Sequence, residues 1–137
     1  MLATSFTIHP KRNLVSIHGK GAPSIQEWYD VVERIIGDPR YRRGMNFLTC
    51  TDGHQLAVTP DYVRDVLAVL ERRSNRMSPA SLAVIAPSPV DFGMARMMET
   101  LSETATTVVR AFKRPREAIE WLKDPVPFSH QGQLAIV

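Results

Sequence analysis

The stretch SLAVIAPSPVD, residues 81–91, joins six small or apolar residues to the opening of a helix. A short run such as 81–86 is typical of a strand that is buried on both faces of a parallel sheet. Ser88 then offers a side-chain cap, Pro89 suits the first helical position, and Asp91 suits the first turn. A buried strand that leads into a capped helix is the repeating unit of α/β proteins.

The same unit recurs on both sides of this stretch. Upstream, MNFLTC at 45–50 predicts a strand, and Thr59 with Pro60 opens a helix through the same cap and proline pattern. Downstream, TTVVRAF at 106–112 predicts another strand, and Pro115 opens the last helix. Strands that alternate with helices in this way predict a mainly parallel sheet.

Two alternating runs, 3–9 and 14–18, precede these repeats. The turn between them is too short for the crossover that parallel neighbours need, so we expect an antiparallel hairpin. Ser24 and Glu27 have the spacing of a capping box and begin the first helix. The predicted order is therefore β-β-α-β-α-β-α-β-α.

This order predicts an α/β fold with a mixed, mainly parallel five-stranded sheet and four helices. A chain of 137 residues with 44% apolar residues has enough material for one such domain. We place that domain at residues 1–124. Residues 125–137, PVPFSHQGQLAIV, are expected to form a C-terminal tail in which two prolines block a helix.

Composition and charge indicate the cellular compartment and the classes of partner that the sequence predicts. No window approaches the roughly 18 apolar residues of a membrane span, and the first residues lack a leader pattern. The single cysteine, Cys50, excludes an intramolecular disulfide and fits a reducing compartment. We expect a cytoplasmic protein. The net charge of +3 is mild, and without a stacking platform or recognition helix it does not predict nucleic-acid binding.

The densest polar stretch is CTDGHQ at 50–55, at the predicted carboxyl end of a strand. Ligand sites in α/β sheets usually lie at that end. A thiol, a carboxylate and an imidazole could form a catalytic set, but we expect Cys50 to be buried in its strand and Asp52 with Gly53 to form an ordinary turn. No enzyme is predicted, and four scattered histidines and the lack of a phosphate-binding glycine motif predict neither metal nor cofactor.

The order of elements, together with FGMARMME at 92–99 after the strand 81–86, resembles the STAS domains of anti-sigma-factor antagonists and sulfate transporters. The resemblance is greatest to the small stand-alone bacterial branch, which is also compared with CRAL-TRIO lipid-binding domains, and it covers roughly residues 3–123. It implies a regulatory module that binds a protein partner, such as a kinase or a sigma-factor regulator. In the antagonists a serine at the start of the second helix is phosphorylated; Thr59 holds that place here, next to Pro60 and without a preceding acid.

The predicted partner-binding face combines the loop after the third strand with the starts of the next two helices. Its residues are Asp52, Gly53, His54, Thr59, Pro60, Asp91 and Phe92. Two alternatives stay open: Thr59 serves only as a helix cap, or the protein carries a small ligand or lipid in a cavity walled by the methionine-rich helix. Residues 134–137 could also add a strand to a neighbouring subunit and so form a homodimer.

Overall fold

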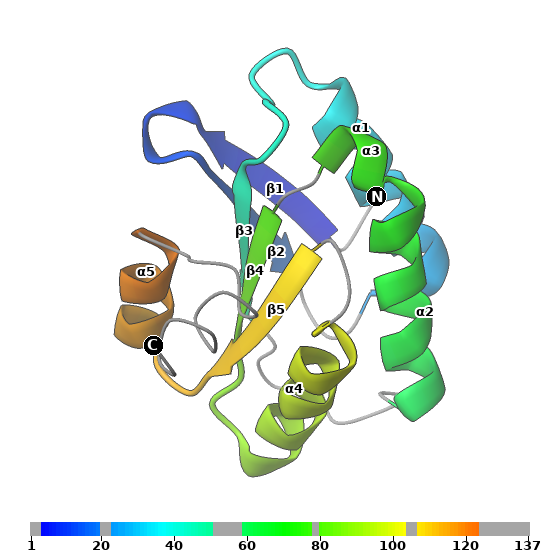
Figure 1. The fold of residues 1–137 in the computed structure, drawn as a ribbon, viewed down its shortest axis with the longest axis vertical. Helices are drawn as coiled ribbons and strands as arrows, with labels where there is room; N and C mark the ends of the chain where they lie inside the picture. The colour runs from blue at the N-terminus through cyan, green and yellow to red at the C-terminus, as the bar shows by residue number, and fades with distance from the viewer. Residues whose placement is uncertain (1–3, 20–22, 51–58, 78–79, 104–106, 124–137) are drawn as a thin grey trace, which may run out of the picture.

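The computed structural model describes residues 4–19, 23–50, 59–77, 80–103 and 107–123. In these ranges the chain forms one α/β domain on a five-stranded sheet (Figure 1). The strands are β1 (Thr4–His9), β2 (Leu14–Gly19), β3 (Asn46–Cys50), β4 (Ala80–Ile85) and β5 (Thr107–Phe112). The helices are α1 (Ile25–Gly37), α2 (Pro60–Arg72), α3 (Ser74–Met77), α4 (Pro89–Leu101) and α5 (Pro115–Lys123), with a short 3-10 turn at Pro10–Arg12.

The strands lie side by side in the order in which they occur in the chain. β1 and β2 pair antiparallel, with Phe6 opposite Ile17, and the other three pairings are parallel. The predicted fold class, hairpin and order of main elements are confirmed. The four-residue helix α3 is an addition, in the polar segment where the sequence predicted only the end of the second helix.

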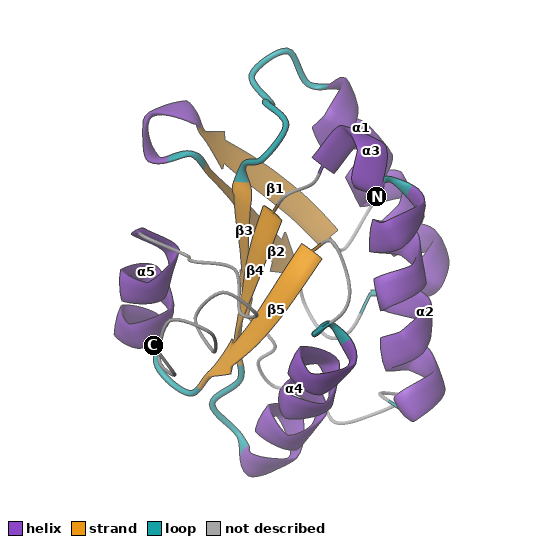
Figure 2. Cartoon of the chain, viewed as in Figure 1, coloured by secondary structure: helices purple, strands orange, loops and turns teal. Residues whose placement is uncertain are grey.

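Helices cover both faces of the sheet unequally (Figures 1 and 2). Each β-α-β connection steps to the next strand in the same direction, and right-handed crossovers therefore place α1, α2 and α4 on one face. α5 follows the last strand and packs on the other face, where Ala118 and Leu122 contact Ala83 and Ile85. No helix of the described segments is long and apolar enough to cross a membrane.

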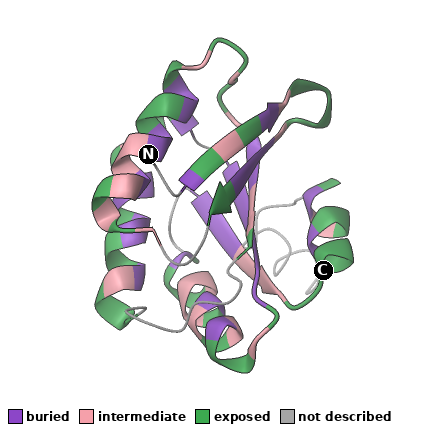
Figure 3. Ribbon diagram, turned by 180° about the vertical axis from the view of Figure 1, so that it is seen from behind, coloured by how far each residue is buried: buried purple, intermediate pink, exposed green. Residues whose placement is uncertain are grey.

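The main core lies between the sheet and the three helices, whose inward faces are buried (Figure 3). All of β4 is buried, as the run at 81–86 predicted. β3 is buried only in its first half, so the expectation that Cys50 is buried was wrong: it is the last residue of the strand and is exposed. Two large apolar side chains lie outside this core: Leu101 and Ile119 are partly exposed, at the end of α4 and in α5.

Candidate functional site

The three helices on the main face, α1, α2 and α4, begin at the same end of the sheet, because each of them follows the carboxyl end of a strand. Their caps are alike: the hydroxyls of Ser24, Thr59 and Ser88 each accept a hydrogen bond of 3.1 Å from the backbone N–H of the third helical residue. Such caps satisfy donors that the first turn of a helix cannot pair internally. Thr59 and Ser88 each precede a proline, and both cap their helices as the sequence predicted.

The third residue of each helix differs. In α1 it is Glu27, in α2 Tyr62 and in α4 Asp91. Glu27 completes a capping box: its carboxylate accepts from the N–H of Ser24 at 3.1 Å and from the hydroxyl of Thr4 at 3.4 Å. Tyr62 and Asp91 instead line a cavity between the helices and the sheet.

That cavity has a volume of about 80 Å³ and is mainly apolar. It opens among the ends of the strands and the first turns of α2 and α4. The sheet contributes Ile17, Leu82 and Val84, and α4 contributes Met94, Ala95 and Met98. Further wall residues are Thr4, His18, Gly19, Pro23, Trp28, Thr49, Cys50, Val63 and Val66.

Two aromatic residues fix one side of the cavity. The indole N–H of Trp28 donates to the hydroxyl of Tyr62 at 2.8 Å, and that hydroxyl donates to the carbonyl of Pro23 at 2.5 Å. Burial raises the pKa of Tyr62 above its ordinary value, although the hydrogen bond from Trp28 lowers it. The phenol therefore stays neutral at physiological pH. The two hydrogen bonds connect α1, α2 and the segment before α1 on one side of the cavity.

Asp91 is the one acid that lines the cavity among the described residues, and it is only 6% exposed. Its Oδ2 accepts from the hydroxyl of Ser88 at 2.9 Å, while its backbone N–H donates to the same hydroxyl. None of the ion pairs between described residues includes Asp91. A carboxylate is thus held in a mostly apolar cavity by one serine and by the amino end of a helix, where negative charge is favoured.

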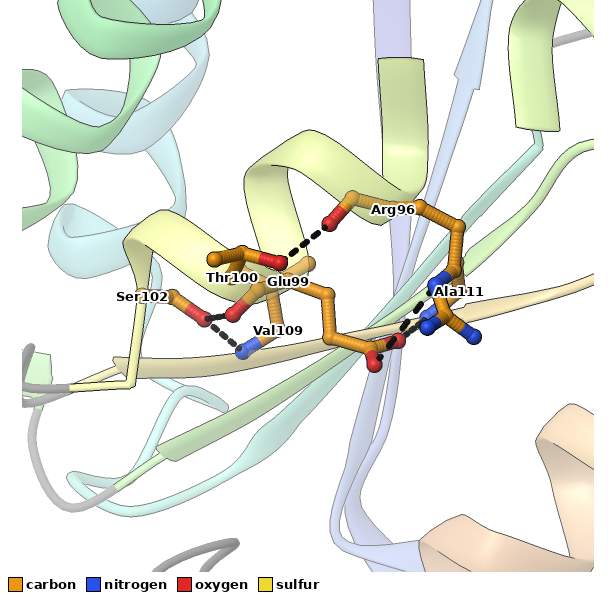
Figure 4. A network of polar contacts seen from close by, with 6 residues as sticks. All are labelled: Arg96, Glu99, Thr100, Ser102, Val109 and Ala111. Atoms are coloured by element: carbon orange, nitrogen blue, oxygen red, sulfur yellow. Dashed lines mark hydrogen bonds and ion pairs between the residues drawn. The ribbon is translucent and has the colours of Figure 1, made fainter. Parts of the chain in front are cut away.

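α4 is fixed at its opposite end by a polar network (Figure 4). The hydroxyl of Ser102 accepts from the backbone N–H of Val109 at 2.9 Å, and Oε1 of Glu99 accepts from the N–H of Ala111 at 2.9 Å. These two side chains satisfy donors of β5, the last strand of the sheet, which would otherwise be open to pairing with another chain. The helix that carries Asp91 is therefore docked firmly on the sheet.

Apolar residues are also exposed at the starts of α2 and α4, the two helices that contribute Tyr62 and Asp91 to the cavity. Val90 is 64% exposed, and Pro87, Pro89 and Pro60 are exposed beside it or on the start of α2. Phe92 is half-buried, and the ammonium group of Lys113 lies 4.9 Å from the centre of its ring. An exposed valine that follows two exposed prolines at a helix start can form part of a surface that partner proteins contact.

The structure places the predicted site residues in different surroundings. Asp52, Gly53 and His54 lie outside the described residues. Thr59 and Pro60 are exposed at the predicted edge. Asp91 was expected on the outer contact face together with Phe92, and it lies instead within the cavity.

Sequence reasoning missed Trp28 and Tyr62 as site residues. The two are 34 positions apart in the chain, and neither belongs to the polar stretch or the helix caps on which the predicted face was based. The available signal was that Tyr62 and Asp91 both stand three residues after a Ser/Thr-Pro cap, which places them on equivalent faces of two parallel helices.

Only part of the catalytic set considered at residues 50–55 belongs to the described residues. Cys50 is exposed, and the carboxylate and imidazole proposed as its partners, Asp52 and His54, lie outside the description. The described residues contain no group of three or more histidine, cysteine, aspartate or glutamate side chains that could hold a metal ion.

A larger groove of about 610 Å³ lies on the face that carries α5. Its walls come from the first residues of the strands, including Leu14, Asn46 and Ser81, and from Ile119 and Lys123 of α5. This is the amino end of the parallel strands. Because α/β sheets bind ligands at the carboxyl end, the smaller cavity is the better candidate site.

No family model matches the chain, and the comparisons with curated proteins and with solved structures returned no match either.

Proposed function

We propose that the protein is a non-enzymatic, cytoplasmic module that binds a protein partner through the carboxyl edge of its sheet. The observation that carries this proposal is the group of exposed apolar residues at the start of α4, where Val90 is 64% exposed directly after Pro89 and Pro87 is exposed as well. Neighbouring exposed apolar residues mark a contact surface better than a single one does. The neighbouring helix start, with Thr59 and Pro60, extends the same surface.

The resemblance to STAS domains supports the same proposal, since it implies recognition of a regulatory partner at the start of the second helix. Thr59 is exposed there, and its hydroxyl caps the helix by accepting from the N–H of Tyr62. A phosphate on Thr59 would be tolerated, because free N–H groups and the helix dipole favour negative charge at that position. Phosphorylation of Thr59 is therefore part of the proposal.

The test uses a photo-reactive benzoylphenylalanine at single positions of the full chain, in the cells that produce it. With the probe at position 90 we expect one discrete crosslinked product. With the probe at Leu101 or Ile119, which are also partly exposed but lie away from this edge, we expect none. Equal products at all three positions, or no product at position 90, would contradict the proposal.

Thr59→Glu sharpens the same experiment. The acid suits the helix start, so the melting temperature should stay within a few degrees while the yield of the crosslink at position 90 changes at least twofold. An unchanged yield would remove Thr59 from the contact face.

The cavity itself favours a second candidate, a carrier of a small apolar ligand. Its walls are mainly apolar, and one of them is the methionine-rich α4. A volume of about 80 Å³ is well below the roughly 300 Å³ at which drug-sized ligand pockets begin, so a lipid chain would need more room. Native mass spectrometry of the purified protein tests this candidate, and a bare mass counts against it.

A further inference from the structure

The cavity holds a carboxylate that has no cationic partner within the described chain. Asp91 is more than nine-tenths buried and lines the cavity. Its contacts are those with Ser88, which occupy Oδ2 and leave Oδ1 without a hydrogen-bond donor from any described residue. Lys113 is the cation of the adjacent strand end, and it lies over the ring of Phe92 without pairing with Asp91.

The charge of Asp91 restricts what the cavity can receive. An anionic ligand, such as a fatty acid, would be repelled by the carboxylate. A neutral apolar group would remove water from Oδ1 without replacing the lost hydrogen bond, which costs free energy. A metal ion needs several ligands, and the described residues offer no cluster of three. An organic cation is the class that satisfies both the carboxylate and the apolar walls.

The size of the cavity narrows this class further. An apolar cavity of about 150 Å³ accepts benzene, so a cavity of about 80 Å³ accepts a narrower, linear group. A lysine side chain is a four-carbon apolar stem that ends in one compact ammonium group. An arginine side chain ends in a planar group with five donors, and most of these would stay unpaired beside a single free carboxylate oxygen.

We infer that the cavity receives a lysine side chain of the protein partner, with Asp91 as the counter-ion of its ammonium group. That the ammonium group belongs to a partner's lysine, and not to a free amine, rests on the proposed function. Val90 and the neighbouring prolines then hold the partner's backbone at the rim, while one side chain enters the cavity. The pairing of Asp91 with an ammonium group gives the contact surface a specificity that exposed apolar contacts alone do not supply.

The test uses purified full-length protein and two probes that differ only in charge. N-acetyl-lysine methylamide carries the stem and the ammonium, and N-acetyl-norleucine methylamide carries a stem without it. The two tryptophans report binding by NMR: the indole N–H of Trp28 lies in the cavity wall, whereas Trp121 lies on α5 at the other face. We expect the lysine probe to shift the Trp28 signal saturably, at millimolar concentration, and to leave Trp121 unchanged.

Two variants at equivalent helix positions complete the design. Asp91→Asn should weaken the lysine probe at least tenfold, whereas Glu27→Gln, at the third position of α1, should leave binding within twofold. The norleucine probe should bind at least tenfold more weakly than the lysine probe to the wild-type protein. That comparison needs no variant, so it holds even if Asp91→Asn fails to fold.

Each other outcome overturns the inference. Equal binding of lysine and norleucine probes, or unchanged binding by Asp91→Asn, would show that the carboxylate plays no part. Binding of n-butylammonium without binding of the lysine probe would show that the cavity takes free amines and not a partner side chain. Failure of both probes while the crosslink at position 90 persists would refute the lysine and leave the proposed contact surface standing.

Discussion

Glu27 and Asp91 occupy the same third position of their helices, behind the same kind of serine cap, yet their surroundings differ. Glu27 is half-buried, and its two carboxylate oxygens are both hydrogen-bonded, to the N–H of Ser24 and the hydroxyl of Thr4. Asp91 is buried, with one oxygen held by Ser88 and the other facing no donor from the described chain. The first acid completes a local structure, whereas the second retains a binding capacity that its own helix does not use.

The difference follows from length and position. The side chain of glutamate reaches back to the backbone of its cap, and α1 lies beside β1, which supplies Thr4. The side chain of aspartate is one carbon shorter, and α4 packs on the edge strand β5 and against α2. Asp91 there lines the cavity together with mainly apolar residues of α2, α4 and the sheet. A shared capping pattern thus leads to a structural acid in one helix and a candidate recognition acid in the other.

The largest effect is expected at the cap that supports the buried acid. Ser88→Ala removes both the cap and the one hydroxyl of the described residues that donates to Asp91, so we expect the free energy of unfolding to fall by about 2–3 kcal/mol. Thr59→Ala is the matched control. It removes a cap but leaves no buried carboxylate without its hydrogen bond. The free energy of unfolding should therefore fall by about 1 kcal/mol. Urea unfolding measures both, and equal losses would show that Asp91 does not depend on Ser88.

The aromatic wall of the cavity gives the next effect. Tyr62→Phe leaves the indole N–H of Trp28 without its acceptor, and a buried unpaired donor should cost about 1–2 kcal/mol. Tyr29→Phe, at a partly buried position of α1 where Arg72 of α2 lies against the ring, removes a hydroxyl for which no hydrogen bond is described and should change stability by less than about 0.5 kcal/mol. Thermal unfolding followed by circular dichroism distinguishes the two, and a silent Tyr62→Phe would contradict the hydrogen-bonded wall.

A smaller effect is expected when Glu27 is changed. Glutamine is also accepted at the third position of a capping box, so Glu27→Gln should alter the free energy of unfolding by less than about 0.5 kcal/mol. The same urea experiment applies. A loss above 1 kcal/mol would mean that the charge of Glu27 contributes as much to stability as the charge of a buried acid. That result would contradict the distinction drawn between Glu27 and Asp91.

The smallest effect concerns Asp38, which forms an ion pair with Arg40, whereas Asp91 forms none with the described residues. Hydrogen bonds from the side chain and backbone of Arg40 lower its pKa from 3.8 to about 2. The stabilisation from this pair is present above pH 3.8 and is lost as the pH falls toward 2. Carbon-detected NMR should place the titration of Asp38 near 2, and Arg40→Gln should return it toward 3.8. A midpoint near 4 in the wild-type protein would contradict the pairing.

Most of the fold could be predicted from the sequence because its signals are local. The run at 81–86, the serine, threonine and proline caps, and the short hairpin turn each act over a few residues, and together they define the order of strands and helices. The site was predicted less completely. Thr59, Pro60 and Asp91 were assigned together to a partner-binding face, which stays a prediction. The burial of Asp91 could not be predicted, since it depends on how α2 and α4 pack over the sheet.

The same reason explains two further differences. The contact of Trp28 with Tyr62 joins two helices that are brought together only by the strand order, so neither residue stood out from its own buried stripe. Cys50 was expected to be buried because its run is apolar, but the end of a strand is more exposed than its middle. Local patterns defined the elements, and packing between elements created the cavity.

The central claim is that Asp91 makes the apolar cavity a site for an ammonium group on a short stem. Intermolecular NOEs between the methylene protons of N-acetyl-lysine methylamide and methyl groups of the full-length protein test it most directly. The account predicts NOEs to the methyl groups of Met94 and Met98, which line the cavity, and none to Ile119 in the groove on the other face. NOEs to Ile119 without any to the two methionines would contradict it.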